Sequence, residues 1–117
     1  MDSTYVVGID VGGQTSKIGV VDARGTVLAQ TVIRTDTFGE IEPYIAELAE
    51  AVKRIIKEAG VEGKVRGIGV GAPNGNYYTG TIENAPNLLW GRERVEFSKL
   101  LSEAMGGLPV ALTNDAN

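Results

Sequence analysis

The sequence predicts an α/β domain built on a five-stranded mixed sheet, and the order of its periodic segments supports this class. Three β-branched runs of strand length come first, separated by short turns. A segment with the apolar spacing of an amphipathic helix follows them. A fourth strand, a second helix and a last strand complete the chain. Strands so close in sequence form an antiparallel meander, and helical crossovers then add parallel strands to it.

The three opening strands are expected at residues 5–11, 17–22 and 27–34. β-Branched residues are frequent in them, and such side chains favour extended backbone. A Gly-Gly pair lies at the first turn and is, on its own, an ordinary hairpin signal. The second turn is short and ends in glycine, as many tight turns do.

The first helix is expected from about Glu40 to Ala59. Pro43 lies within its first turn, where the missing N–H has no helical partner to lose, and Gly60 suits the position after the last turn. The charged residues fall mostly on the opposite face, where solvation is their ordinary role. The apolar stripe recurs at steps of three and four residues and consists of Ile41, Ile45, Leu48, Val52, Ile55 and Ala59.

The second half of the chain contains two more strands and one more helix. The strands are expected at residues 65–71 and 109–112, and the helix at 95–105. Residues 72–94 form a long connection in which 79–82 has the pattern of a short strand. Long connections are functional or disordered in most domains, and the aromatic content of this one argues against disorder.

The predicted strand order is 3-2-1-4-5, with both helices placed by right-handed crossovers. This order brings the ends of the first, fourth and fifth strands side by side. Asp10, the loop after Gly71 and the Asn114-Asp115 pair are therefore expected at one edge of the sheet. Open α/β sheets bind their ligands at that edge.

The composition excludes several kinds of chemistry. The 117 residues include no cysteine and no histidine, so thiolate and imidazole metal ligands are not available. A net charge of −4 argues against nucleic-acid binding, which needs a basic surface. The chain shows no signal peptide and no apolar stretch of membrane-spanning length, so a cytoplasmic domain with no membrane partner is expected.

The turn after the first strand has the composition of an anion site. Asp10 ends the strand, and Gly12 and Gly13 can adopt positive φ and let an anion approach the backbone N–H groups. Thr15 adds a hydroxyl and Lys17 a cation, which are groups that phosphate sites often use. The pattern is weak alone, because a plain hairpin turn is its commoner explanation.

Four motifs occur together, in an order and spacing that resemble the ROK family of sugar kinases. They are Asp10-x-Gly12-Gly13, Gly69-x-Gly71-Ala72-Pro73-Asn74-Gly75, Asn84-Ala-Pro-Asn-Leu88 and Thr113-Asn114-Asp115-Ala116-Asn117. The resemblance covers essentially the whole chain and is to the N-terminal lobe of a ROK glucokinase. It implies the ribonuclease-H-like fold of the actin-like ATPases and hexokinases.

The resemblance implies ATP-dependent phosphorylation of a hexose, with glucose as the expected substrate. Asp115 matches the catalytic base that deprotonates the 6-hydroxyl of the sugar. Asn74, Asn84 and Asn114 fall in segments that contact sugar hydroxyls, together with Asp115 itself. An asparagine amide both donates and accepts hydrogen bonds, which suits such a ligand.

The same resemblance implies ATP and Mg²⁺ as cofactors. Asp10 matches the acid that helps to hold magnesium, often through water. Gln14 stands where the family usually has threonine, and Thr15 offers a hydroxyl nearby. The residues expected at the nucleotide phosphates are Asp10, Gly12, Gly13, Gln14, Thr15 and Lys17.

One departure from the family concerns the extent of the chain. The second lobe, with its adenosine pocket, further sugar ligands and Cys/His zinc site, does not follow residue 117. Residues 1–117 are therefore expected to be one domain, inactive by itself, whose C-terminal lobe is absent. For the full-length protein the expectation is a homo-oligomer that binds only small molecules, the sugar and ATP.

Two other functions are compatible with this fold. A ribonuclease-H-like nuclease or resolvase would bind two metals through Asp10 and either Glu83 or Asp115, although the acidic balance opposes it. A sugar-sensing ROK-type transcriptional regulator would need a helix-turn-helix ahead of the first strand. Taken singly, Asp115 also fits a helix N-cap, and asparagines such as Asn74 and Asn84 fit turns.

Overall fold

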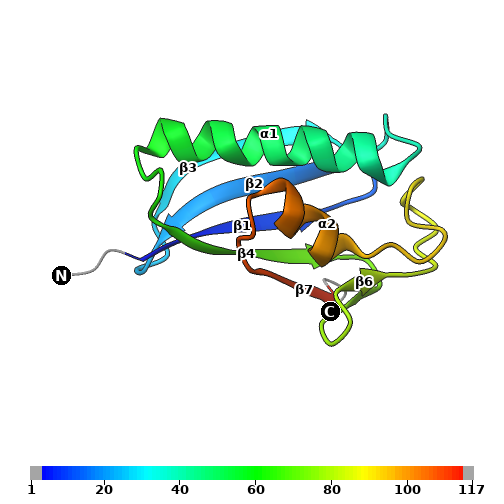
Figure 1. Ribbon diagram of the computed structural model, residues 1–117. Helices are drawn as coiled ribbons and strands as arrows, with labels where there is room; N and C mark the ends of the chain where they lie inside the picture. Colours follow the sequence, from blue (N-terminus) through cyan, green and yellow to red (C-terminus); the bar gives the residue numbers. More distant parts are fainter. Residues whose placement is uncertain (1–3, 115–117) are drawn as a thin grey trace.

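The computed structural model describes residues 4–114. Its elements follow the predicted order, with one additional short hairpin between the fourth strand and the second helix (Figure 1). In chain order they are β1 (Tyr5–Val11), β2 (Thr15–Asp22), β3 (Val27–Arg34), α1 (Ile41–Ala59), β4 (Val65–Ala72), β5 (Gly75–Asn76), β6 (Thr81–Ile82), α2 (Phe97–Ala104) and β7 (Val110–Asn114).

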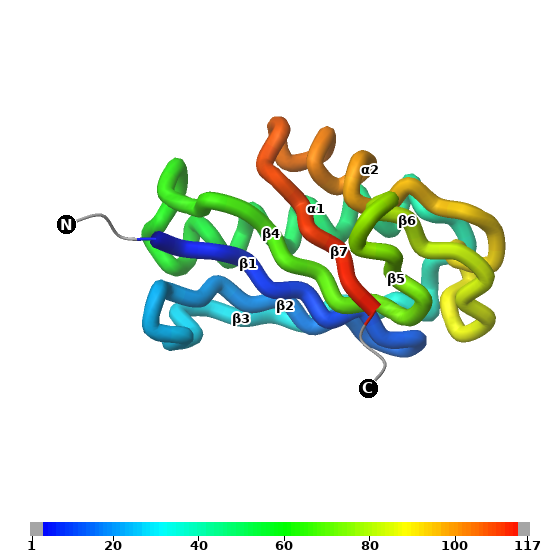
Figure 2. Tube along the Cα trace, turned by 90° about the horizontal axis from the view of Figure 1, so that it is seen from below, coloured from blue at the N-terminus to red at the C-terminus, as the bar shows by residue number. Residues whose placement is uncertain are grey.

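The main sheet has the strand order β3-β2-β1-β4-β7, which confirms the prediction. The three opening strands pair antiparallel, and β4 and β7 then extend the sheet in parallel. Parallel neighbours end at the same edge, so the carboxyl ends of β1, β4 and β7 lie side by side (Figure 2). The tip of the β1–β2 hairpin also lies at this edge.

Both helices cover the same face of the sheet. Helix α1 packs against β2 and β3, and α2 packs against β7 and α1. Alternate strand residues such as Val7, Ile9 and Val11 point toward the helices and are buried. The predicted first helix is confirmed, because Pro43 lies in its first turn and Gly60 ends it with φ of 71°.

The opposite face of the sheet carries no helix within residues 4–114. Valines and several glycines point outward there, and three apolar side chains on it are at least 37% exposed: Val6, Val27 and Val32. No helix in the described part of the chain is both long and apolar enough to span a membrane.

Several boundaries differ from the sequence expectation. Strand β2 begins at Thr15 and not at residue 17, because Thr15 and Ser16 already pair with the end of β3. Strand β7 extends to Asn114 through its pairing with β4. Helix α2 is shorter than expected, and only Thr81 and Ile82 of the predicted 79–82 strand are paired.

The long connection folds into a compact segment. Residues 84–91 are held by bonds from the Ala85 N–H to the Gly91 carbonyl and from the Gly91 N–H to the Leu88 carbonyl, each 2.9 Å long. Trp90 is only 5% exposed and stacks on Tyr44 and Phe97. Its role is therefore packing, which is common for large aromatic side chains.

Candidate functional site

The strand register places the predicted site residues at one edge. Asp10 of β1 lies opposite Gly71 of β4, and Gly71 in turn lies opposite Thr113 of β7. The next residue of β4, Ala72, lies opposite Asn114. Asp10, the loop after β4 and Asn114 are thus brought together, as the predicted strand order required. Asp115 lies outside the described residues.

The hairpin tip is built differently from the prediction. Neither Gly12 nor Gly13 adopts the left-handed φ that the sequence suggested. The two glycines are needed for space, because a Cβ on Gly12 would lie 2.9 Å from the Thr15 carbonyl oxygen and one on Gly13 would lie 3.0 Å from that of Asn87. The Gly12 N–H donates to the Thr15 carbonyl at 2.9 Å and closes the turn.

Thr15 belongs to β2 and not to the loop that the sequence suggested, and Lys17 lies in the same strand, as its predicted bounds required. Lys17 lies opposite Asp10 in the β1–β2 pair, and both side chains are exposed on the face without helices. A shallow cavity of about 740 Å³ begins there and continues over Gly8 and Gly69. The carboxylate and the ammonium group therefore line the same open surface, beside the tip.

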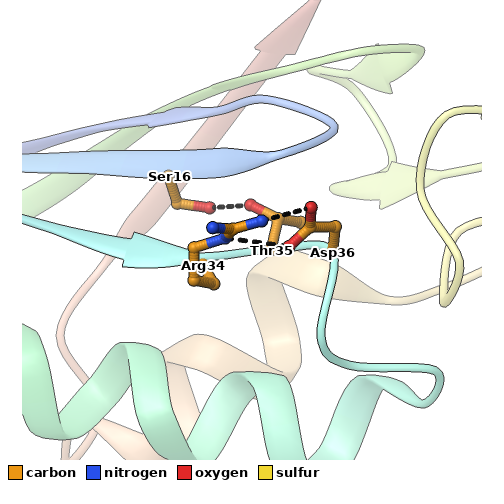
Figure 3. A network of polar contacts seen from close by, with 4 residues as sticks. All are labelled: Ser16, Arg34, Thr35 and Asp36. Atoms are coloured by element: carbon orange, nitrogen blue, oxygen red, sulfur yellow. Dashed lines mark hydrogen bonds and ion pairs between the residues drawn. The ribbon is translucent and has the colours of Figure 1, made fainter.

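Gln14 is tied to the residues that follow β3. Its carbonyl oxygen accepts bonds from the N–H groups of Thr35 at 2.8 Å and Asp36 at 3.4 Å. Asp36 also accepts two bonds from the Arg34 guanidinium, at 3.0 and 2.7 Å (Figure 3). The hydrogen bond from Arg34 is the main cause that lowers the pKa of the Asp36 carboxyl, so Asp36 is ionised at neutral pH.

Three buried hydroxyls lie directly beneath the tip. The Ser16 Oγ is 2.6 Å from the Thr35 Oγ1 and 2.6 Å from the Tyr44 hydroxyl oxygen (Figure 3 shows the Ser16–Thr35 contact). Burial raises the pKa of Tyr44 to about 12, so its hydroxyl keeps its proton at neutral pH. The sequence signal for this cluster was Ser16, a polar residue at an inward position of β2, which must find a partner.

Asn74 and Asn84 are the two non-glycine residues with positive φ in the described part of the chain, at 58° and 54°. Asparagine tolerates this conformation better than most residues, and strained positions gather at functional sites. The Asn74 Nδ2 donates to the carbonyls of Glu83 at 3.1 Å and Asn84 at 2.8 Å. Both hydrogens of its amide are thus used to hold the loop that carries Asn84.

Asn84 itself lies at a cavity that the sequence did not indicate. The cavity has a volume of about 360 Å³ and is lined by Asn84, Pro86 and Arg92. Its size falls within the usual range of small-molecule pockets. Asn84 is exposed there, and its backbone carbonyl accepts the hydrogen bond from the Asn74 side chain.

We expect Asn74→Asp to lower the free energy of unfolding by about 2 kcal/mol at pH 7. The substitution keeps the left-handed backbone accessible but replaces the donor to two carbonyls by an acceptor. The measurement is urea unfolding of the 117-residue chain. Asn76→Asp is the matched control, because the Asn76 Oδ1 accepts from the N–H groups of Tyr78 and Thr79 and a carboxylate preserves both bonds. Equal stability of the two variants would contradict the assigned role of Asn74.

Asp10 is the described carboxylate that was predicted to help hold magnesium at this edge. No group of three or more aspartates or glutamates in the described residues is arranged to bind a metal. Mg²⁺ in nucleotide sites usually keeps several waters and takes one or two carboxylates together with phosphate oxygens. The single exposed carboxylate of Asp10 is consistent with a site in which phosphate oxygens and water supply the other ligands.

Comparisons with known proteins identify relatives for nearly the whole chain. The model of the ROK family matches residues 6–117. The glucokinase of Streptomyces coelicolor is 33% identical over 112 residues, which are 95% of this chain and 32% of that protein. The chain therefore spans about a third of the length of the curated relatives that it matches.

Solved structures show the same arrangement of elements. A ROK hexokinase from Thermus thermophilus matches with a TM-score of 0.75 and 38% identity, over 97% of this chain and 36% of that one. A ROK family glucokinase from Streptomyces griseus, solved with glucose and AMPPNP, matches with a TM-score of 0.77 and 27% identity, over 97% and 34%. These similarities confirm the predicted fold.

Proposed function

The chain belongs to the ROK family, and from this premise we propose that it is the N-terminal lobe of a kinase that transfers the γ-phosphoryl group of ATP to the 6-hydroxyl of glucose. The observation that carries the proposal is the convergence of Asp10, the loop after β4 and Asn114 at one edge of the sheet. A glucokinase relative and a glucose complex of a related structure support glucose as the sugar.

Phosphoryl transfer depends on positioning and on neutralising charge more than on covalent help from the protein. The hairpin tip would receive the nucleotide phosphates through backbone N–H groups. The Gly12 N–H already donates to Thr15, so the N–H groups of Gly13 and Gln14 are the ones we assign to the phosphates. Lys17, on the neighbouring surface, would add positive charge. Magnesium beside Asp10 would neutralise the phosphates.

On the sugar side, Asn84 and Asn114 would hold hydroxyls of the glucose, and Asn74 would act by fixing the backbone of Asn84. Asp115 follows directly after β7 in sequence and would accept the proton of the 6-hydroxyl as its oxygen attacks phosphorus. In this arrangement the sugar and the phosphates approach the same edge from β7 and from the β1–β2 hairpin. We also place the activity in the cytoplasm, where ATP is available, and expect the full-length protein to form a homo-oligomer.

The test is a coupled assay for glucose 6-phosphate with the full-length protein and with residues 1–117 alone. We expect ATP-dependent product from the full-length protein and none above background from the 117 residues, because one lobe supplies only part of the nucleotide and sugar contacts. Mannose and N-acetylmannosamine serve as competing substrates. Failure of the full-length protein to phosphorylate any hexose would exclude the proposal, and activity of the isolated lobe would contradict its incompleteness.

A further inference from the structure

Tyr44 is the buried residue that joins two separate parts of the proposed site. It lies in the first turn of α1, and its side chain has no exposed surface. Its hydroxyl points to the β1–β2 hairpin and its ring to the segment of residues 84–91. The hydroxyl contacts the part of the protein that is proposed to bind the nucleotide phosphates. The ring contacts the part that is proposed to bind the sugar.

The hydroxyl end contacts the base of the hairpin tip. The Tyr44 oxygen is 2.6 Å from the Ser16 Oγ, which is also 2.6 Å from the Thr35 Oγ1. The Thr35 N–H donates at 2.8 Å to the carbonyl of Gln14, inside the tip. All three hydroxyl-bearing residues are at most 1% exposed. A hydroxyl that loses its hydrogen-bond partner here is not solvated by water, so the loss lowers stability.

The ring end contacts the segment that carries the sugar-side asparagine. The Tyr44 ring stacks on Trp90 with centroids 4.7 Å apart and an interplanar angle of 24°. Trp90 stacks in turn on Phe97 at 5.8 Å. Stacked aromatic pairs of this kind contribute beyond the area that they bury and fix the orientation of both rings. The position of residues 84–91 therefore depends on the Tyr44 ring.

The hairpin tip and this segment also touch each other directly. Gly13 approaches Asn87 so closely that a Cβ would lie 3.0 Å from its carbonyl oxygen. The two parts thus meet at the surface through Gly13 and beneath it through Tyr44. With a single contact, the hairpin tip could rotate relative to residues 84–91. Two contacts at different depths fix the orientation of one relative to the other.

We propose that Tyr44 is a positioning residue that sets the hairpin tip against residues 84–91, and so sets the nucleotide phosphates against the sugar. This inference rests on the proposed function. The Tyr44 hydroxyl positions the hairpin tip, which is proposed to bind the phosphates. The Tyr44 ring positions residues 84–91, which carry the proposed sugar ligand Asn84. The two sides can therefore be separated by substitution, because phenylalanine removes the hydroxyl and keeps the ring.

In the full-length protein, we expect Tyr44→Phe to raise the KM for ATP about tenfold, because the buried Ser16 hydroxyl at the base of the tip loses one of its two partners. The KM for glucose should stay within about twofold, because the ring still stacks on Trp90. Tyr44→Leu removes both contacts and should raise both KM values. Tyr78→Phe, at a side chain that is 93% exposed, is the matched control and should change neither.

Backbone hydrogen exchange of the 117-residue chain gives a measurement that does not need activity. The Thr35 and Asp36 N–H groups donate to the Gln14 carbonyl, and their exchange reports how firmly the tip is held. We expect about tenfold faster exchange at these two positions in Tyr44→Phe. Exchange in the interior of β1 and β4 should stay close to that of the unchanged chain.

The two readouts distinguish failure of this inference from failure of the proposed function. If the unchanged full-length protein phosphorylates no hexose, the proposed function fails and the exchange at Thr35 and Asp36 alone decides the role of Tyr44. If the protein is active, unchanged KM for ATP in Tyr44→Phe overturns the inference. Uniformly faster exchange over the whole sheet, with both KM values unchanged, would show a role in stability only.

Discussion

Asp115→Asn in the full-length protein is expected to lower kcat by about 10²- to 10⁴-fold, the usual contribution of a positioned general base. The amide has nearly the same shape as the carboxylate and can still accept a hydrogen bond from the sugar, but it cannot take the proton. The dissociation constant for glucose should therefore change by no more than about threefold. Single-turnover kinetics and equilibrium glucose binding measure the two quantities separately.

The control for this prediction is Asp22→Asn. Asp22 ends β2 at the opposite edge of the sheet, and its Oδ1 accepts bonds from the N–H groups of Arg24 and Thr26, which an asparagine oxygen also accepts. It should leave kcat unchanged. A normal kcat in Asp115→Asn would exclude Asp115 as the base, and a parallel loss of glucose binding would assign it to binding.

Gly75→Ala is expected to lower the free energy of unfolding by about 3 kcal/mol, the upper part of the range for overpacking. A Cβ at this position would lie 2.5 Å from the Thr113 carbonyl oxygen, 2.9 Å from its carbon and 3.2 Å from the Ala72 carbonyl oxygen. All three are backbone atoms, so no side chain can turn away. The end of β7 must move, or the β5–β6 hairpin must separate from it.

Urea unfolding of the 117-residue chain measures this effect. Gly69→Ala is the matched control, because Gly69 lies within β4 and a Cβ there would meet nothing within 4 Å. It should change stability by less than about 0.5 kcal/mol. In the full-length protein, Gly75→Ala should also weaken glucose binding, since Asn114 follows Thr113 directly. Equal stability of the two variants would show that the contact between Gly75 and β7 is not tight.

The features that the sequence predicted well depend on local patterns. The apolar stripe of the first helix, with Pro43 in its first turn and Gly60 after its last, gives nearly the observed α1. The β-branched runs identified the three opening strands, with β1 at its observed bounds. Because the crossover rules leave few topologies, the strand order followed from these elements, and the order alone placed Asp10 near the end of β7.

The features that the sequence could not predict depend on contacts between distant segments. Gly13 is needed because Asn87 lies against it, and neither residue reveals this locally. The turn chemistry suggested positive φ at Gly12 and Gly13, which do not have it, whereas the two non-glycine residues with positive φ in the described part of the chain are Asn74 and Asn84. The bonds from the Asn74 amide nitrogen to the carbonyls of Glu83 and Asn84 also join segments that are distant in the sequence, and no local pattern indicates them.

A crystal structure of the full-length protein with glucose and AMPPNP would decide whether the ends of β1, β4 and β7 form a single binding edge. We predict glucose hydroxyls within hydrogen-bond distance of Asn84 and Asn114, the 6-hydroxyl at Asp115, and the phosphates facing residues 12–15. Glucose or the phosphates bound on the sheet face that carries Val6 and Val32, with this edge unoccupied, would contradict the proposed site.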